Sequence, residues 1–279
     1  MSMYLQPRSL SAAIDALAAR GGRILAGGTD FYPALGVLPA SGPIVDISRL
    51  DELNGIAVTK EVFRIGATTT WNEIAQANLP PCFDGLKAAA REVGAIQIQN
   101  RATLGGNLCN ASPAADGVPA LLVLDARLVL ASPSGERRLG LDQFVLGNRR
   151  TVLRPDEILV AIEVPRRLAN YRSRFIKLGA RCYLVISIVM VAVALEVDAR
   201  GAIADARVAV GACSPVARRL PDLEADLCGR GADAGSSGLV EARHLAALSP
   251  IDDLRASAAY RHHAAIKLVE RTIDACLGV

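Results

Sequence analysis

Hydrophobic residues recur at helical spacing through residues 9–20 and then fall into short uninterrupted runs. The first pattern predicts a helix, which the Gly-Gly pair at 21–22 ends. Apolar runs at 23–26 and 44–47 predict two short strands. The chain therefore begins with a mixed unit of helix and strand, and its first strand leads directly into a second pair of glycines.

The pattern continues with strands and helices in mixed order. Runs near 55–58 and 62–66 predict a pair of strands around a polar turn. Thr70 followed by Glu73 is the signature of a capping box and predicts a helix through Ala77. A further helix is expected from residue 83 to about residue 93.

The second half favours longer strands. Runs at 127–131 and 157–164 predict two of them, and Pro165 ends the second. The polar stretch 166–170 that follows is typical of a linker and predicts a domain boundary. Beyond it we expect an antiparallel sheet of three long strands at 174–179, 184–197 and 206–211, then helices, of which the last spans 258–276. This order is typical of an α+β fold.

Composition narrows the class of protein. The net charge is only +3 and the basic residues are scattered, which argues against nucleic-acid binding. The longest apolar run, Tyr183 to Leu195, is shorter than the roughly 20 residues of a membrane helix, and its β-branched residues favour a buried strand. The amino terminus lacks the pattern of a secretory signal. The six cysteines include no close pair, so no metal site is expected, and the predicted location is cytoplasmic.

Two glycine-rich segments carry the candidate chemistry. Ala26-Gly27-Gly28-Thr29-Asp30 and Thr103-Leu104-Gly105-Gly106-Asn107 share one pattern: an apolar stretch, paired glycines and a small polar residue. Paired glycines permit positive φ and expose consecutive N–H groups, which suits an anion such as a pyrophosphate. Neither segment has the spacing of a Walker or Rossmann motif. One such pair would more often be a plain turn; two predict an anion cradle without naming its ligand.

A longer run around the second segment resembles a known family. Residues 101–116, Arg-Ala-Thr-Leu-Gly-Gly-Asn-Leu-Cys-Asn-Ala-Ser-Pro-Ala-Ala-Asp, resemble the flavin loop of the FAD-binding medium subunits of molybdenum hydroxylases, the family of xanthine dehydrogenase, carbon monoxide dehydrogenase and 4-hydroxybenzoyl-CoA reductase. Residues 26–30, 64–68, 156–165 and 259–261 are also similar to the family. The resemblance implies a two-part FAD-binding domain of the vanillyl-alcohol-oxidase/CO-dehydrogenase flavoprotein type at 1–167, with subdomains of about 1–53 and 54–167. A CO-dehydrogenase-flavoprotein-like C-terminal domain is implied at 168–279, with a three-stranded antiparallel sheet and helices.

The resemblance also implies which residues bind FAD. Arg23 to Phe31 should line the pyrophosphate and adenosine side, and Asp116 should accept a hydrogen bond from the flavin or the ribityl chain. An apolar wall, a backbone contact at Cys109, a residue near the adenine and a basic residue near the flavin complete the implied set. That set is Arg23, Ile24, Leu25, Ala26, Gly27, Gly28, Thr29, Asp30, Phe31, Val93, Gly94, Ile98, Ala102, Thr103, Gly105, Gly106, Asn107, Cys109, Asp116, Leu159 and Lys177.

Several of these residues have simpler explanations. Asp116 is alternatively a helix cap, Lys177 a solvated strand residue and Arg23 a surface charge. Cys109 is expected to be a small buried side chain rather than a reactive thiol. Because no histidine precedes His244, noncovalent FAD is favoured over a histidine-linked flavin.

The implied function is electron transfer within an oxidoreductase complex. A large partner subunit would hold the molybdenum-pterin centre and a small one the [2Fe–2S] clusters, with NAD, a quinone or dioxygen as the external acceptor. No catalytic acid or base is expected here. In reductases of the 4-hydroxybenzoyl-CoA class, the FAD subunit carries an inserted loop with four cysteines for an extra [4Fe–4S] cluster. Here residues 65–101 contain a single cysteine, Cys82, so that cluster is not expected. Two alternatives remain: a stand-alone FAD-dependent oxidase or reductase of the same fold superfamily, and a scaffold protein without flavin.

Overall fold

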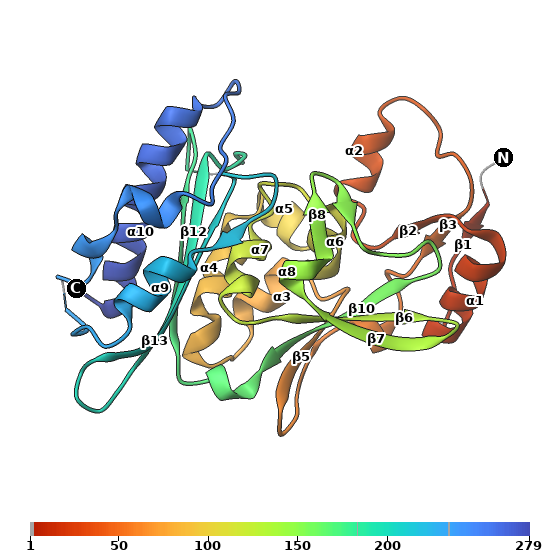
Figure 1. Ribbon diagram of the computed structural model, residues 1–279. Coiled ribbons are helices and arrows are strands. Elements are labelled where there is room, and N and C mark those ends of the chain that lie inside the picture. Colours follow the sequence, from red (N-terminus) through yellow and green to blue (C-terminus); the bar gives the residue numbers. More distant parts are fainter. Residues whose placement is uncertain (1–2, 183, 234) are drawn as a thin grey trace.

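The computed structural model describes residues 3–182, 184–233 and 235–279, and builds them into three main sheets and a two-stranded ribbon. Figure 1 shows the three sheets following one another across the molecule, with helices between and outside them. Within the described residues no helix is both long and apolar enough to cross a membrane. No group of three or more potential metal ligands gathers among those residues either.

The first sheet is small and parallel. Its strands β1 (Tyr4–Leu5), β2 (Arg23–Leu25) and β3 (Ile44–Asp46) lie in the order β1-β3-β2. Helix α1 (Leu10–Arg20) connects β1 to β2, and the Ser9 side chain accepts a hydrogen bond from the Ala12 N–H at its start. The short helix α2 (Phe31–Leu35) follows β2. The local pattern predicted α1, β2 and β3 correctly.

The second sheet is antiparallel and has its latest strand in the middle. Its order is β4 (Ile56–Val58), β5 (Val62–Gly66), β10 (Ile158–Pro165), β6 (Arg127–Ser132) and β7 (Gly135–Gly140). Both faces of β10 are buried, because Val160 packs with α1 and the first sheet while Ile162 packs with the central helices. A strand buried on both faces has a continuous apolar sequence, which is why 157–164 was easy to predict.

The central helices lie between the second and third sheets (Figure 1). Thr70 and Glu73 form the predicted capping box at the start of α3. The central helices are α3 (Trp71–Gln76), α4 (Asp84–Glu92), α5 (Ile96–Gln99), α6 (Leu104–Asn110), α7 (Gly117–Leu122) and α8 (Leu141–Phe144). Strands β8 (Val145–Gly147) and β9 (Arg150–Thr151) form the two-stranded ribbon. Elsewhere in the chain, single 3-10 turns span Asp51–Leu53, Pro81–Phe83, Arg166–Leu168, Ser237–Leu239 and Ala242–Leu245.

The C-terminal sheet has four strands where the sequence predicted three. Its order is β11 (Arg172–Leu178), β12 (Val189–Val197), β13 (Ile203–Gly211) and β14 (Arg218–Arg219), all antiparallel. The missed strand is two residues of arginine, too short and too polar for an apolar pattern. Strand β12 also begins at Val189 rather than at the predicted Leu184, whose φ of 54° is left-handed and incompatible with a strand. Tyr183, the first residue of the apolar run noted in the sequence, lies outside the described residues.

Both faces of the C-terminal sheet are covered. Along β12, Val189, Val191 and Val193 pack toward α9 (Pro221–Leu227) and α10 (Ala258–Leu277), whereas Met190 and Ala192 pack into the core of the central helices. Figure 1 shows α10 on the outer side of this sheet and α4 and α7 on the inner side. One hydrophobic core therefore continues from the central helices onto the C-terminal sheet.

Candidate cofactor site

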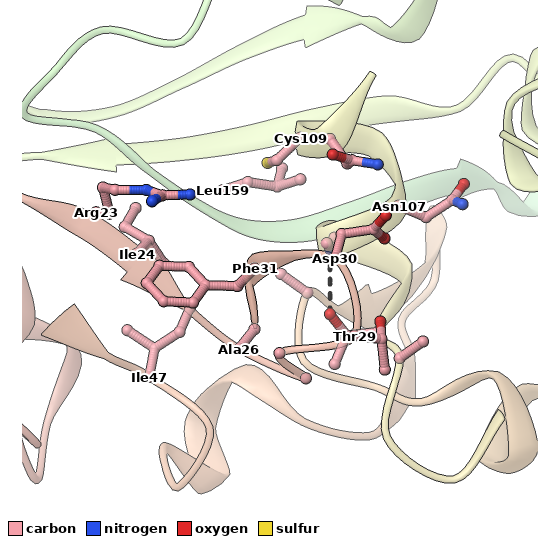
Figure 2. A pocket seen from close by; sticks show the side chains of 18 of the residues that line it. Arg23, Ile24, Ala26, Thr29, Asp30, Phe31, Ile47, Asn107, Cys109 and Leu159 are labelled. Carbon is pink, nitrogen blue, oxygen red and sulfur yellow. Dashed lines mark hydrogen bonds between the residues drawn. The ribbon is translucent and has the colours of Figure 1, made fainter. Parts of the chain in front are cut away.

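A cavity of about 470 Å³ lies beside the first sheet, where β2 ends against α6 and the start of β10. That volume falls within the range of small-molecule and cofactor sites, roughly 300–1,000 Å³. Its walls come from three stretches of chain, at 22–34, 93–110 and 149–159, with Leu17, Ile47, Ala67 and Trp71 filling the gaps. Figure 2 shows the side chains of the first two stretches facing each other across it.

Most of the predicted site residues meet in this cavity. Those that line it are Arg23, Ile24, Ala26, Gly27, Gly28, Thr29, Asp30, Phe31, Val93, Ile98, Ala102, Thr103, Gly105, Gly106, Asn107, Cys109 and Leu159. Four predicted residues do not line it: Leu25, Gly94, Asp116 and Lys177. Gly94 has a φ of 57° and forms the turn between Val93 and Ile98; Leu25 is buried in the strand that leads to the cavity.

The first glycine-rich segment presents unpaired amide groups. Within the described residues, the N–H groups of Gly27, Gly28, Thr29 and Asp30 donate to no protein acceptor, and all four residues line the cavity. Gly28 has a φ of 79°, which turns the chain around the amides. Successive free N–H groups around such a turn form an anion-binding concavity. This segment has the predicted cradle geometry.

The second segment differs from its prediction, because it is the first turn of helix α6 and not a loop. The Gly105 N–H donates to the Ala67 carbonyl at 2.9 Å, and the Gly106 N–H donates to Thr103 Oγ1 at 3.1 Å. The Asn107 N–H is bonded to the Thr103 carbonyl at 3.0 Å. The expectation of free N–H groups here was therefore wrong. The local pattern gave no sign of this helix, since glycine is a poor helix former.

Gly105 of the second segment serves close packing instead. A Cβ on Gly105 would lie 2.7 Å from the Ala67 carbonyl oxygen. A Cβ on Gly27 would lie 2.0 Å from the Arg101 carbonyl oxygen. The first segment is thus in direct backbone contact with Arg101, which comes just before the second segment in sequence. The two segments form adjoining walls of one cavity.

Arginines surround the mouth of the cavity. The Arg23 guanidinium lies over the Phe31 ring at 4.4 Å from its centre, so Arg23 is exposed yet held at the site. Arg149 has a left-handed φ of 54°, its N–H donates to the Ala111 carbonyl, and its side chain donates to Asn110 Oδ1 at 2.9 Å. Because the basic residues are scattered along the sequence, the sequence pattern did not single out Arg149.

The third stretch was largely missed. Leu153, Arg154, Pro155, Glu157 and Ile158 line the cavity beside the predicted Leu159. Arg137 donates to Glu157 at 2.6 and 2.8 Å and thereby lowers the pKa of that carboxyl. The similarity of 156–165 to the family was the only signal for this wall, and of these residues only Leu159 was assigned to the site.

Cys109 faces the cavity as a neutral group. Burial raises the pKa of its thiol to about 12, so it carries no charge at neutral pH. This agrees with the expected role of a small, partly buried side chain rather than a reactive one.

Asp116 and Lys177 form a buried ion pair behind the cavity. Lys177 Nζ lies 3.0 Å from Asp116 Oδ2, and Ser187 Oγ donates to Asp116 Oδ1 at 3.1 Å. Burial raises the pKa of Asp116, while the Lys177 ammonium and the Ser187 hydroxyl oppose that rise. The Asp116 side chain makes no capping bond to α7, and the Lys177 side chain is only 5 % exposed. The cap and the solvated-strand explanations were therefore both wrong.

A free-amide cradle, an arginine-lined mouth and an apolar interior together define a site for a large anionic cofactor, of the kind found in dinucleotide-binding proteins. Comparison with known protein families identifies the family to which the chain belongs. The model of the FAD-binding domain in molybdopterin dehydrogenase matches residues 1–167, and that of the CO dehydrogenase flavoprotein C-terminal domain matches residues 164–276. The chain belongs to the family of FAD-binding medium subunits of molybdenum hydroxylases and is an oxidoreductase subunit.

Individual relatives agree with this assignment. The chain is 31 % identical over 280 residues to a putative xanthine dehydrogenase FAD-binding subunit of Escherichia coli K12, covering 97 % of this chain and 94 % of the relative. It is 38 % identical over 185 residues to the nicotinate dehydrogenase FAD-subunit of Eubacterium barkeri, covering 64 % and 62 %. The structure matches quinoline 2-oxidoreductase from Pseudomonas putida 86 with a TM-score of 0.91 and 26 % identity, over 100 % of this chain and 97 % of that one.

Proposed function

We propose that this chain holds FAD noncovalently in the cavity and passes electrons from [2Fe–2S] clusters of a small partner subunit to an external acceptor. A large partner subunit would hold the molybdenum-pterin centre at which the organic substrate is oxidised. NAD, a quinone or dioxygen would serve as the acceptor. Membership of a family of FAD subunits from multi-subunit molybdenum hydroxylases supports this arrangement.

The observation that carries the proposal is the set of unpaired amides at residues 27–30. The four residues line the cavity and their N–H groups have no acceptor among the described residues, so a pyrophosphate bound there would complete their hydrogen bonds. The donor set therefore fits FAD.

The remaining residues would set the environment of the cofactor. Arg23 and Arg149 are placed to balance the charge of the pyrophosphate at the cavity mouth. Val93, Ile98 and Leu159 offer an apolar surface for an aromatic ring system, with Leu159 proposed beside the adenine. When bound, the flavin supplies the ability to accept electrons singly and release them in pairs, and the protein supplies position and solvent exclusion. Asp116 and Lys177 stay proposed cofactor contacts.

The test is purification of the chain from its native host with everything that accompanies it. We expect FAD released by denaturation, together with a larger partner that contains molybdenum and a smaller one that contains iron and sulfide. A chain that purifies alone, contains neither metal and oxidises an organic substrate would contradict the proposal and favour a stand-alone flavoenzyme. A chain that stays colourless when incubated with FAD would also contradict the proposal, and would favour a scaffold protein without flavin.

A further inference from the structure

A buried arginine at the head of the last helix lies behind the cofactor site. Arg261 is in the first turn of α10 and is only 2 % exposed. A cation there opposes the helix dipole, which favours negative charge in the first turn. Burying a charge also costs free energy unless it is fully paired. The position is therefore unfavourable for the helix unless the guanidinium binds strong partners elsewhere.

The guanidinium joins two segments at the same end of the C-terminal sheet. One terminal nitrogen donates to the Ile188 carbonyl at 2.6 Å and to the Ala212 carbonyl at 3.1 Å. The other donates to Asp253 Oδ1 at 2.7 Å, which supplies the balancing charge. Ile188 directly precedes β12 and Ala212 directly follows β13. A single side chain thus ties the entry of one strand to the exit of its neighbour.

Both segments in turn hold the loop that follows α6. The Ala212 N–H donates to the Pro113 carbonyl at 3.1 Å. Ser187, next to Ile188, donates through its hydroxyl to Asp116 at 3.1 Å. The loop held at these two points continues directly from Asn107, Cys109 and Asn110, which line the cavity. Two short chains of contacts therefore run from Arg261 to the loop that continues from the cavity wall.

We propose that Arg261 is a positioning residue that fixes the loop 111–116, and through it the FAD-binding wall of α6, by clasping the segments at Ser187-Ile188 and Ala212. This inference rests on the proposed function, since it assigns the residue a role toward bound FAD. Ala212 has a left-handed φ of 62°, an unfavourable conformation for a non-glycine residue that its bonded N–H and carbonyl hold in place. The planar guanidinium reaches two carbonyls and a carboxylate together, which an ammonium on a flexible stem does not reproduce.

The test compares Arg261→Met and Arg261→Lys with the wild-type chain. Three measurements are made on each: urea unfolding, amide hydrogen exchange of peptides covering 111–116 and 211–213 in the flavin-free chain, and FAD affinity by titration. We expect Arg261→Met to accelerate exchange in both peptides and to weaken FAD binding about tenfold or more, since a hydrogen-bonded charged donor is lost. Arg261→Lys, which keeps the charge beside Asp253, should fall between Met and wild type.

The matched control is Arg207→Met. Arg207 is also a buried arginine of the C-terminal sheet, but it pairs with Asp125 and Asp205 and does not contact either clasped segment. The Arg207→Met variant should have a lower free energy of unfolding, while its amide exchange at 111–116 and its FAD affinity stay at the wild-type level. Equal effects of the Arg207 and Arg261 variants on the loop would overturn the proposal, because any loosening of the domain would then suffice.

A milder variant covers the case in which Arg261→Met does not fold. Ser187→Ala cuts one of the two links without removing a charge, and it should accelerate exchange at 114–116 and weaken FAD binding a few-fold. Wild-type exchange and affinity in both Ser187→Ala and Arg261→Lys would refute the clasp. If the wild-type chain itself binds no FAD, the proposed function fails, whereas the exchange measurement still decides whether Arg261 holds the loop.

Discussion

Gly27-Gly28 and Gly105-Gly106 stand on adjoining walls of one cavity, yet their backbones are used in different ways. The amides of the first pair donate to no acceptor in the described residues, and both glycines line the cavity. Those of the second pair are bonded to Ala67 and Thr103 inside the protein. Free donors thus belong to the first pair alone, whereas each pair has one glycine that close packing requires, Gly27 against Arg101 and Gly105 against Ala67.

The difference shows that paired glycines indicate a constraint without saying which one. Gly28 is required for a positive φ, which only the backbone conformation reveals. Gly105 is required because the Ala67 backbone leaves no space for a side chain. The following variants separate donors from packing, ordered from the largest expected effect to the smallest.

Gly105→Val should be the most damaging change. Its side chain would meet the Ala67 backbone, with Cβ only 2.7 Å from the carbonyl oxygen, so neither partner can yield easily. We expect the free energy of unfolding to fall by about 3 kcal/mol or more, with FAD binding lost as a consequence. Gly106→Ala is the control, because its Cβ meets only the Thr103 hydroxyl and should cost about 1 kcal/mol at most. Equal urea midpoints for the two variants would contradict the packing role.

Gly28→Ala should act on the cofactor more than on the fold. A left-handed φ costs an L-residue about 1–2 kcal/mol, and relief of that strain would turn the free amides away from the cavity. We expect FAD affinity to fall about tenfold or more by titration. Gly36→Ala also puts an alanine at a positive φ, 60° with a ψ of −122°, but lies outside the cavity and meets no atom within 4 Å. Equal FAD affinities in the two variants would contradict a role of the Gly28 turn and its free amides in binding FAD.

Thr103→Ala and Thr70→Ala compare two helix caps, of which only the first lines the cavity. Each threonine hydroxyl accepts an N–H at the start of a helix, α6 and α3 respectively. Each variant should lose about 1 kcal/mol of unfolding free energy. Only Thr103→Ala should also weaken FAD binding, by a few-fold, because α6 forms the cavity wall. A matching loss of affinity in Thr70→Ala would mean that general stability controls binding.

Glu157 should give the smallest effect, visible on acidification. Its folded pKa lies below the ordinary 4.5 because Arg137 stabilises the carboxylate. The stabilisation is therefore present above pH 4.5 and lost as the pH falls through the folded pKa. Glu157→Gln should be less stable near neutral pH and should show a flatter decline in acid than wild type. If the unfolding free energies of wild type and Glu157→Gln, measured from pH 7 to pH 3, changed with identical slopes, the ion pair with Arg137 would not stabilise this wall.

Local sequence signals predicted the elements that are stabilised locally. The Gly21 stop of α1 and the capping box of Thr70 and Glu73 depend on neighbours a few residues away. Likewise, the buried strand β10 has a pattern that needs no partner to be recognised. These features could be predicted without the fold.

Features that depend on distant partners were missed or misjudged. Helix α6 begins with two glycines and is stabilised by its packing on Ala67, which no local pattern reveals. The left-handed Arg149 is held by the carbonyl of Ala111, 38 positions earlier (149 − 111). Lys177 and Asp116 pair across 61 positions. Resemblance to the family pointed to most of the cavity, but not to these contacts.

The central place of β10 has a consequence for the order of events during synthesis. Strands β5 and β6 leave the ribosome long before β10, which must insert between them and which also carries the last cavity wall. Until then the two hairpins, β4-β5 and β6-β7, have exposed edges that are prone to wrong pairing. The cofactor would therefore be loaded only once residue 159 has emerged and folded. An early supply of FAD would not protect the nascent chain.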